Sequence, residues 1–227
     1  MANFGFSRLA VVAPFEEHWR EAKSAIGASD LLQNARNTPR LAEAVADYTL
    51  VIGTGTLAHR KPEQTVVPLP ELAPFVVAEL GRGGRVALVF GPEKRGLTRD
   101  DLALCHMLVK IPTDPRQPSM NLGQAVAVCL YELAARGSRT SSDEAIARTP
   151  DSGVDETAPA SSRDLDLLAE VVAETMQAAN YSPAAMQKAN SHDLHLLLRR
   201  LKLERRDARR ILGLFRRILW RLKHFQS

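Results

Sequence analysis

Cysteine is scarce in this sequence, and long apolar runs are absent. The 227 residues include two cysteines, Cys105 and Cys129, which is too few for a disulfide framework. Neither belongs to a CxxC pair or a His-rich cluster, so we expect no metal site. No segment approaches the roughly 18 consecutive apolar residues of a membrane-spanning helix. The N-terminus also lacks a signal-peptide core, so we expect a soluble, cytoplasmic protein without a membrane partner.

A dinucleotide-binding fingerprint is missing as well. Gly53-Thr-Gly-Thr56 places two glycines at the end of an apolar segment. The fingerprint needs a helix directly after its glycines, whereas Leu57 to Pro62 is basic and ends in proline. We therefore interpret this stretch as a turn and not as a nicotinamide or flavin site.

Strand-like and helix-like segments alternate from residue 8 to residue 136. Short apolar runs predict strands at 9–13, 48–52, 86–90 and 107–111. Amphipathic segments predict helices at 16–26, 40–46, 70–80 and from residue 121 onward. Strands separated by helices of this length indicate an α/β fold, with a mostly parallel sheet and helices on both of its faces.

Two loops that leave predicted strands form the candidate ligand site. After the strand 86–90, Glu93 lies on a tight turn, and Thr98 can cap the helix that follows. After the strand 107–111, Ser119 or Asn121 can cap the long helix. In open α/β sheets, ligands bind beyond the carboxyl ends of the strands. The two loops could therefore hold a small polar ligand between them.

The same loops carry two gapped motifs. They are Phe-Gly-Pro-Glu-x-x-Gly-Leu at 90–97 and Ile-Pro-x(6)-Ser-Met-Asn-Leu-x-x-Ala-Val at 111–126. Both motifs, in this order, resemble those of the SpoU branch of the SPOUT RNA ribose 2′-O-methyltransferases. The resemblance implies S-adenosylmethionine as cofactor, a C-terminal trefoil knot in the α/β domain and a homodimer with both cofactor sites near the interface.

The resemblance also assigns residues to the site. The cofactor-binding residues would be Gly53, Thr54, Gly91, Glu93, Gly96, Ile111, Ser119, Met120 and Leu122. The catalytic polar side chains would be Ser119, Asn121 and Glu93. Simpler roles stay open, because the two loop glycines could only permit a turn and Asn121 could only cap a helix. For Glu93 we favour an organising role over direct base catalysis.

One family motif has no counterpart here. Members carry a first strand and Asn-x-Gly-x-x-x-Arg ahead of the segment that resembles Phe4 to Leu9, and that arginine is assigned to activating the ribose hydroxyl. We expect the native start to lie upstream and a chain that begins at Met1 to be weak or inactive in methyl transfer. The alternative is a natural RNA-binding relative without catalytic activity.

The C-terminal third differs in composition and charge. Residues 137–163 are rich in Ser, Thr, Gly and Pro and predict a flexible linker between a methyltransferase domain, 1–136, and a small all-α domain, 164–227. Residues 188–227 contain 12 Lys and Arg but 3 Asp and Glu, which indicates an RNA-backbone clamp. A merely solvated basic face is the alternative.

The predicted RNA-binding residues are Arg60, Lys61, Arg205, Arg206, Arg209, Arg210, Arg217 and Arg221. A helical extension of this kind resembles the TrmJ subgroup, which methylates the ribose at position 32 of the tRNA anticodon loop. The resemblance thus implies a tRNA cytidine/uridine ribose 2′-O-methyltransferase. An rRNA methyltransferase, or a nucleotide-binding α/β enzyme unrelated to RNA, remains as an alternative.

Overall fold

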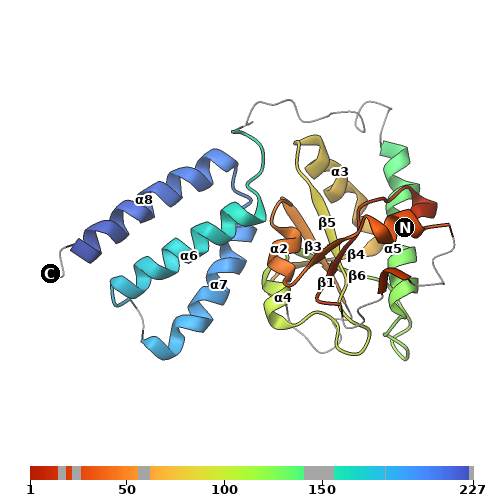
Figure 1. The fold of residues 1–227 in the computed structure, drawn as a ribbon, viewed down its shortest axis with the longest axis horizontal. Coiled ribbons are helices and arrows are strands. Elements are labelled where there is room, and N and C mark those ends of the chain that lie inside the picture. Colours follow the sequence, from red (N-terminus) through yellow and green to blue (C-terminus); the bar gives the residue numbers. More distant parts are fainter. Residues whose placement is uncertain (15–18, 22–26, 56–61, 141–155, 182, 225–227) are drawn as a thin grey trace.

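The structure, a computed structural model, describes residues 1–14, 19–21, 27–55, 62–140, 156–181 and 183–224. Figure 1 shows two parts side by side: strands with helices around them, and a group of helices from the C-terminal third of the chain. Within the described residues, no helix is both long and apolar enough to cross a bilayer.

A four-stranded sheet forms the centre of the α/β part. Its strands are β3 (Leu50–Thr54), β4 (Thr65–Pro68), β5 (Val86–Val89) and β6 (Met107–Lys110), in the spatial order β4-β6-β3-β5. Every neighbouring pair is parallel. A second, two-stranded parallel sheet joins β1 (Ala10–Val12) to β2 (Arg36–Thr38). The predicted α/β fold with parallel strands is confirmed.

Helices cover both faces of the larger sheet. Because side chains alternate along a strand, Val51 and Ile52 of β3 belong to different core clusters. The Ile52 cluster includes side chains from α3 (Ala73–Gly81) and α5 (Leu122–Thr140). The Val51 cluster is covered by α2 (Leu41–Val45) and α4 (Arg99–Ala103). The strands that lead into the two motif loops are therefore buried on both faces of the sheet, which fixes where the loops begin.

Local sequence signals fix the start of α4. The Thr98 hydroxyl accepts a hydrogen bond from the Asp101 amide (3.1 Å), and the Asp101 carboxylate accepts one from the Thr98 amide (2.9 Å). This reciprocal pair is a capping box, which satisfies two amides that the helix itself cannot pair. The prediction that Thr98 caps this helix is confirmed.

Several short elements were not predicted. The strands β2 and β4 and the helix α1 (Ser29–Gln33) are too short or too polar to show a periodic pattern. The strand β4 lies at the edge of the sheet, where Pro68 is tolerated because its missing N–H faces no further strand. The predicted helix 70–80 divides into a 3₁₀ turn, Leu69–Glu71, and α3.

The predicted helix 16–26 lies mostly outside the described residues. Its described portion, Trp19–Glu21, is a 3₁₀ turn.

The C-terminal part consists of α6 (Ser162–Ala178), the 3₁₀ turn Ala184–Met186, α7 (Gln187–Arg200) and α8 (Arg205–His224). These helices share an apolar core of Leu168, Ala169, Val172 and Leu198, with Ile211, Leu212 and Phe215 packed against it. The predicted linker 137–163 is too long at both ends, because α5 continues to Thr140 and α6 begins at Ser162.

The first residues of α6 attach the helical part to the α/β part. Ser162 is fully buried, and both its amide (2.8 Å) and its hydroxyl (2.9 Å) donate hydrogen bonds to the Tyr48 carbonyl. The Arg163 amide donates to the Ala46 carbonyl at 2.9 Å. These carbonyls lie between α2 and β3, so the helices dock at the edge of the sheet where the strands begin.

Candidate functional site

The two motif loops line a cavity of about 560 Å³ beyond the carboxyl ends of β3, β5 and β6. This volume lies within the range of small-molecule sites. Of the predicted cofactor-binding residues, those that line the cavity are Thr54, Gly91, Glu93, Gly96, Ile111, Ser119, Met120 and Leu122. The fold therefore brings together residues that are separated by as much as 68 positions in sequence.

Gly53 is not among the described residues that line this cavity, and its neighbours explain why a glycine occurs there. A β-carbon at position 53 would lie 2.8 Å from Cys105 Sγ and 2.9 Å from a Leu108 methyl carbon. The glycine is thus required for packing within the sheet core. Gly55, which was not predicted, lines the cavity instead.

The side chain of Glu93 joins the two loops. Its Oε1 atom accepts one hydrogen bond from Asn121 Nδ2 (2.6 Å) and another from the Leu122 amide (3.0 Å). Asn121 Oδ1 in turn accepts from the Gln124 amide at 3.3 Å, so that Asn121, and not Ser119, caps α5. A carboxylate at a helix N-terminus is favoured by the helix dipole. Glu93 therefore organises the loop pair.

The turn around Glu93 depends on its two glycines. Gly96 has a positive φ of 62°, a conformation that side chains with a β-carbon rarely adopt, and its amide donates to the Pro92 carbonyl at 2.7 Å. Gly91 crosses directly over this turn, since a β-carbon there would lie 2.7 Å from the Gly96 carbonyl oxygen. The structure thus gives both glycines a role in shaping the loop.

Three cationic side chains that were not predicted also line the cavity: Lys94, Arg95 and Lys110. Lys94 and Arg95 occupy the two variable positions of the first motif. Their positive charge is visible in the sequence, but a motif that specifies only the invariant positions does not include it. Leu97, Leu108 and Ile111 supply apolar surface in the same cavity. The arrangement suits a ligand that has both an apolar and an anionic part.

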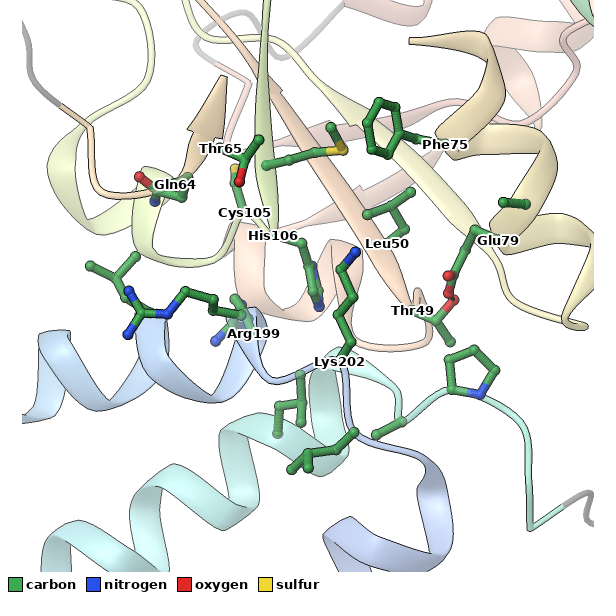
Figure 2. A pocket seen from close by; sticks show the side chains of 18 of the residues that line it. Thr49, Leu50, Gln64, Thr65, Phe75, Glu79, Cys105, His106, Arg199 and Lys202 are labelled. Atoms are coloured by element: carbon green, nitrogen blue, oxygen red, sulfur yellow. Dashed lines mark hydrogen bonds between the residues drawn. The ribbon is translucent and has the colours of Figure 1, made fainter. Parts of the chain in front are cut away.

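A second cavity, of about 210 Å³, lies at the opposite ends of the strands, where they begin, between the sheet and the helical part. Figure 2 shows residues from both parts facing it, including Thr49, His106, Arg199 and Lys202. Neither motif lies in this cavity, so we do not assign the chemistry of the motif loops to it. Its polar groups instead belong to the contact between the α/β part and the helical part.

His106 is the central polar group of this second cavity. Its Nδ1 atom accepts a hydrogen bond from the Val51 amide (3.1 Å), which places the proton of the neutral ring on Nε2. The Nε2 atom is buried and has no hydrogen-bond partner among the described residues. Burial, and secondarily the charge of Arg199, lower the pKa of His106 to about 3. The ring therefore stays neutral at any physiological pH.

We expect acid to destabilise the chain through His106. The unfolded histidine, with a pKa near 6.5, binds a proton below that pH, whereas the folded one does not bind it until about pH 3. Stability therefore falls as the pH decreases through this window, by about 2 kcal/mol at pH 5. Urea unfolding at pH 7 and pH 5 measures this loss. His106→Asn, which retains an acceptor for Val51, should show a smaller loss, and an equal loss in both proteins would contradict the assignment.

The predicted RNA-binding arginines have different surroundings. Arg206 forms ion pairs with Glu204 (3.1 Å) and Asp207 (3.8 Å), and Arg209 forms one with Glu156. The side chains of Arg210, Arg217 and Arg221 are exposed on α8, and Arg205 is half-buried. Arg60 and Lys61 lie outside the described residues. The exposed basic surface is thus centred on α8.

The sequence matches a known protein family. A family model described as the SpoU rRNA Methylase family matches residues 1–131, more than half of the chain. The tRNA (cytidine/uridine/adenosine-2′-O-)-methyltransferase TrmJ of Pseudomonas aeruginosa is 40% identical over 146 residues, which cover 62% of this chain and 56% of that protein. TrmJ of Klebsiella pneumoniae is 40% identical over 134 residues, covering 59% and 54%. The chain thus spans about half the length of these relatives.

Solved structures extend the similarity to the helical part. TrmJ from Z. mobilis superposes with a TM-score of 0.78 at 27% identity, over 96% of this chain and 89% of that one. A probable methylase family protein from Haemophilus influenzae gives a TM-score of 0.57 at 25% identity, over 99% and 89%. With both motif loops around one cavity and the family match over residues 1–131, the chain belongs to the SpoU methylase family of RNA methyltransferases.

Proposed function

We propose that the protein is an S-adenosylmethionine-dependent tRNA ribose 2′-O-methyltransferase on cytidine or uridine, at position 32 of the anticodon loop, and that this chain supplies the cofactor-binding half of its site while being weak or inactive in methyl transfer by itself. The observation that supports it most directly is the pair of hydrogen bonds from Asn121 and Leu122 to Glu93, which joins the two motif loops around one cavity. The names of the relatives support tRNA as the substrate. The family description names rRNA, so an rRNA substrate is the second candidate.

The lining of the cavity supports S-adenosylmethionine as the cofactor. S-adenosylmethionine supplies a methyl group on a positively charged sulfur. Leu97, Leu108 and Ile111 would contact its adenine ring, and Lys94 or Arg95 would pair with its carboxylate. Backbone groups at Thr54 and around Gly91, where the strands end, would hold the remaining polar atoms.

Methyl transfer to a ribose hydroxyl is an in-line displacement, so the protein has to fix the two reactants in one geometry. Ser119 lines the cavity, and we assign its hydroxyl to a contact with the reacting groups. Asn121 and Glu93 hold the loops in place and thereby fix the position of Ser119. Their role is positioning, which agrees with the organising role favoured for Glu93 from the sequence.

We also propose a trefoil knot involving α5, a homodimer, a cytoplasmic location and separate domains at 1–136 and 164–227. Two exposed apolar side chains that are neighbours on α5 support the homodimer: Val128 is 38% exposed and Tyr131 59%. Apolar patches of this kind mark protein contacts. Light scattering of the purified chain tests this, because a monomer at micromolar concentration would contradict it.

RNA binding is assigned to the exposed arginines of α8, with Arg60 and Lys61 as further contacts. Affinity for tRNA should then fall steeply as the salt concentration rises, because bound phosphates release counterions. An RNA-binding relative without catalysis would show this salt dependence but no methyl transfer. Mass spectrometry of tRNA and rRNA from a strain that lacks the gene separates the candidates, since loss of one 2′-O-methyl group identifies the substrate.

Glu93→Ala is expected to weaken S-adenosylmethionine binding about tenfold or more. The substitution removes an acceptor of two hydrogen bonds to a charged group, and each such bond contributes about 1.5–3 kcal/mol. Titration calorimetry with S-adenosylmethionine measures the change. Glu71→Ala, at an exposed position away from the cavity, is the matched control. Unchanged affinity in Glu93→Ala would refute the organising role, and no binding by the unmodified chain would refute the cofactor assignment.

A further inference from the structure

A large aromatic side chain lies on the basic surface of α8. Trp220 is 55% exposed, whereas Ala208 and Leu219 on the same helix are buried. Residues three and four positions apart are neighbours on a helix. The neighbours of Trp220 by this rule are Arg216, Arg217, Lys223 and His224. The indole therefore lies among basic side chains, of which Lys223 pairs with Glu174 of α6.

His224 holds the indole in place. The two rings are stacked, with centroids 4.5 Å apart and planes inclined by 26°. The ring nitrogen Nδ1 of His224 also lies 2.8 Å from the Trp220 carbonyl oxygen. This contact orients the ring while leaving more than half of the Trp220 surface open to solvent.

Packing of the helical part does not explain this position. The core between α6, α7 and α8 consists of other side chains, such as Leu168, Leu198 and Phe215. Figure 1 shows α8 extending away from the sheet, so the end that carries Trp220 is remote from the α/β part. Exposing a large aromatic side chain forgoes the free energy of its burial, and a partner that covers the ring would recover it.

We infer that Trp220 is a stacking platform for an unpaired base of bound RNA, with the neighbouring cations contacting the phosphates beside that base. An aromatic ring can stack on a base only where the base is not already stacked inside a helix, as in loops and single strands. Stacking combined with a basic groove is the general mode of single-strand binding. This inference rests on the proposed function, because it specifies how the same RNA is held.

The charge around Trp220 favours RNA over a second copy of the chain. The helix α8 contains eight Lys and Arg against one Asp, so two copies of this face would repel each other. An RNA backbone carries the opposite charge. Exposed Arg216 and Arg217 adjoin the indole on α8, so the complementary charges and the apolar ring occupy one continuous surface.

Trp220→Ala is expected to weaken the binding of tRNA, and of a short oligouridylate, at least about fivefold, as removal of a stacked aromatic does. The slope of log Kd against log salt should stay unchanged, because stacking releases no counterions. Arg217→Gln should instead reduce that slope by about one. Trp220→Phe, which retains a ring, should recover most of the affinity. Fluorescence anisotropy with labelled RNA measures all four proteins.

Leu214→Ala is the matched control, since Leu214 is 58% exposed on the same helix but has no ring to stack. In a Trp19→Phe background Trp220 is the sole tryptophan, and its emission should be quenched by oligouridylate. Thermal unfolding should be unaffected by Trp220→Ala, because the side chain is exposed.

The possible outcomes separate this inference from the proposed function. Equal RNA affinity for Trp220→Ala and the unmodified chain would overturn the stacking role. If Arg217→Gln nevertheless bound RNA more weakly, the proposal that α8 binds RNA would still hold. A change in oligomeric state on Trp220→Ala, with unchanged RNA affinity, would assign this face to a second copy and also overturn the inference. Absence of tRNA binding by the unmodified chain would overturn the proposed function itself.

Discussion

Arg199→Met is expected to lower the free energy of unfolding by about 3–5 kcal/mol, the usual cost of removing one partner of a buried ion pair. Arg199 is only 2% exposed, and its Nη2 atom donates to Asp166 Oδ1 at 2.6 Å. His195 Nδ1 lies 3.3 Å from the same oxygen. Methionine fills a similar volume but leaves the carboxylate of Asp166 without its cation. Urea unfolding measures the loss.

The protonation of Asp166 should change in the same variant. Burial on its own would raise the pKa of Asp166, but the hydrogen bond with His195 and the charge of Arg199 outweigh it and hold that pKa below its usual value. A carboxylate with a lowered pKa stabilises the fold above its unfolded pKa and loses this contribution as the pH falls through the folded value. Without Arg199 the pKa should rise and this acid dependence should shrink.

Two controls distinguish the buried charge from a general effect of losing an arginine. Arg163 and Asp47 also pair at 3.0 Å, but their side chains are 67% and 44% exposed, so Arg163→Met should cost less than about 1 kcal/mol. The double variant Asp166→Asn, Arg199→Met removes both charges and should recover part of the stability. Equal losses for Arg199→Met and Arg163→Met would contradict the buried-pair explanation.

Gly91→Ala is expected to weaken S-adenosylmethionine binding by about tenfold or more. The new methyl group would lie 2.7 Å from the Gly96 carbonyl oxygen and closer still to the Gly96 carbonyl carbon. Backbone atoms cannot rotate away as a side chain does, so the turn that carries Glu93 has to move. Overpacking costs about 1–3 kcal/mol, and here the cost falls on the loop that lines the cavity. Titration calorimetry with S-adenosylmethionine measures it.

Gly81→Ala is the matched control for this substitution. Gly81 ends α3, and a β-carbon there meets no atom within 4 Å. Alanine also favours the helix, so Gly81→Ala should leave cofactor affinity unchanged and stability equal or slightly higher. If Gly91→Ala bound S-adenosylmethionine as well as Gly81→Ala, the crossing of Gly91 over the turn would not control the cavity.

The local elements could be predicted because they depend on neighbours in sequence. Three of the four strands of the larger sheet follow from short apolar runs, and the start of α4 follows from Thr98 and the acids after it. The edge strand β4 has only four residues and ends in Pro68, so its identity depends on pairing with β6, which no local pattern records.

The sequence by itself determined the parallel α/β architecture, the two motif loops at the carboxyl ends of its strands and the basic character of α8. Only the tertiary structure decided that Gly53 packs in the core, that Glu93 joins Asn121 and that Arg199 is buried against Asp166. The physical reason is the distance along the sequence over which each effect acts. Periodicity and capping act over one or two helical turns, whereas these contacts join positions 28 to 55 residues apart, and the packing of the whole sheet and its helices brings those positions together.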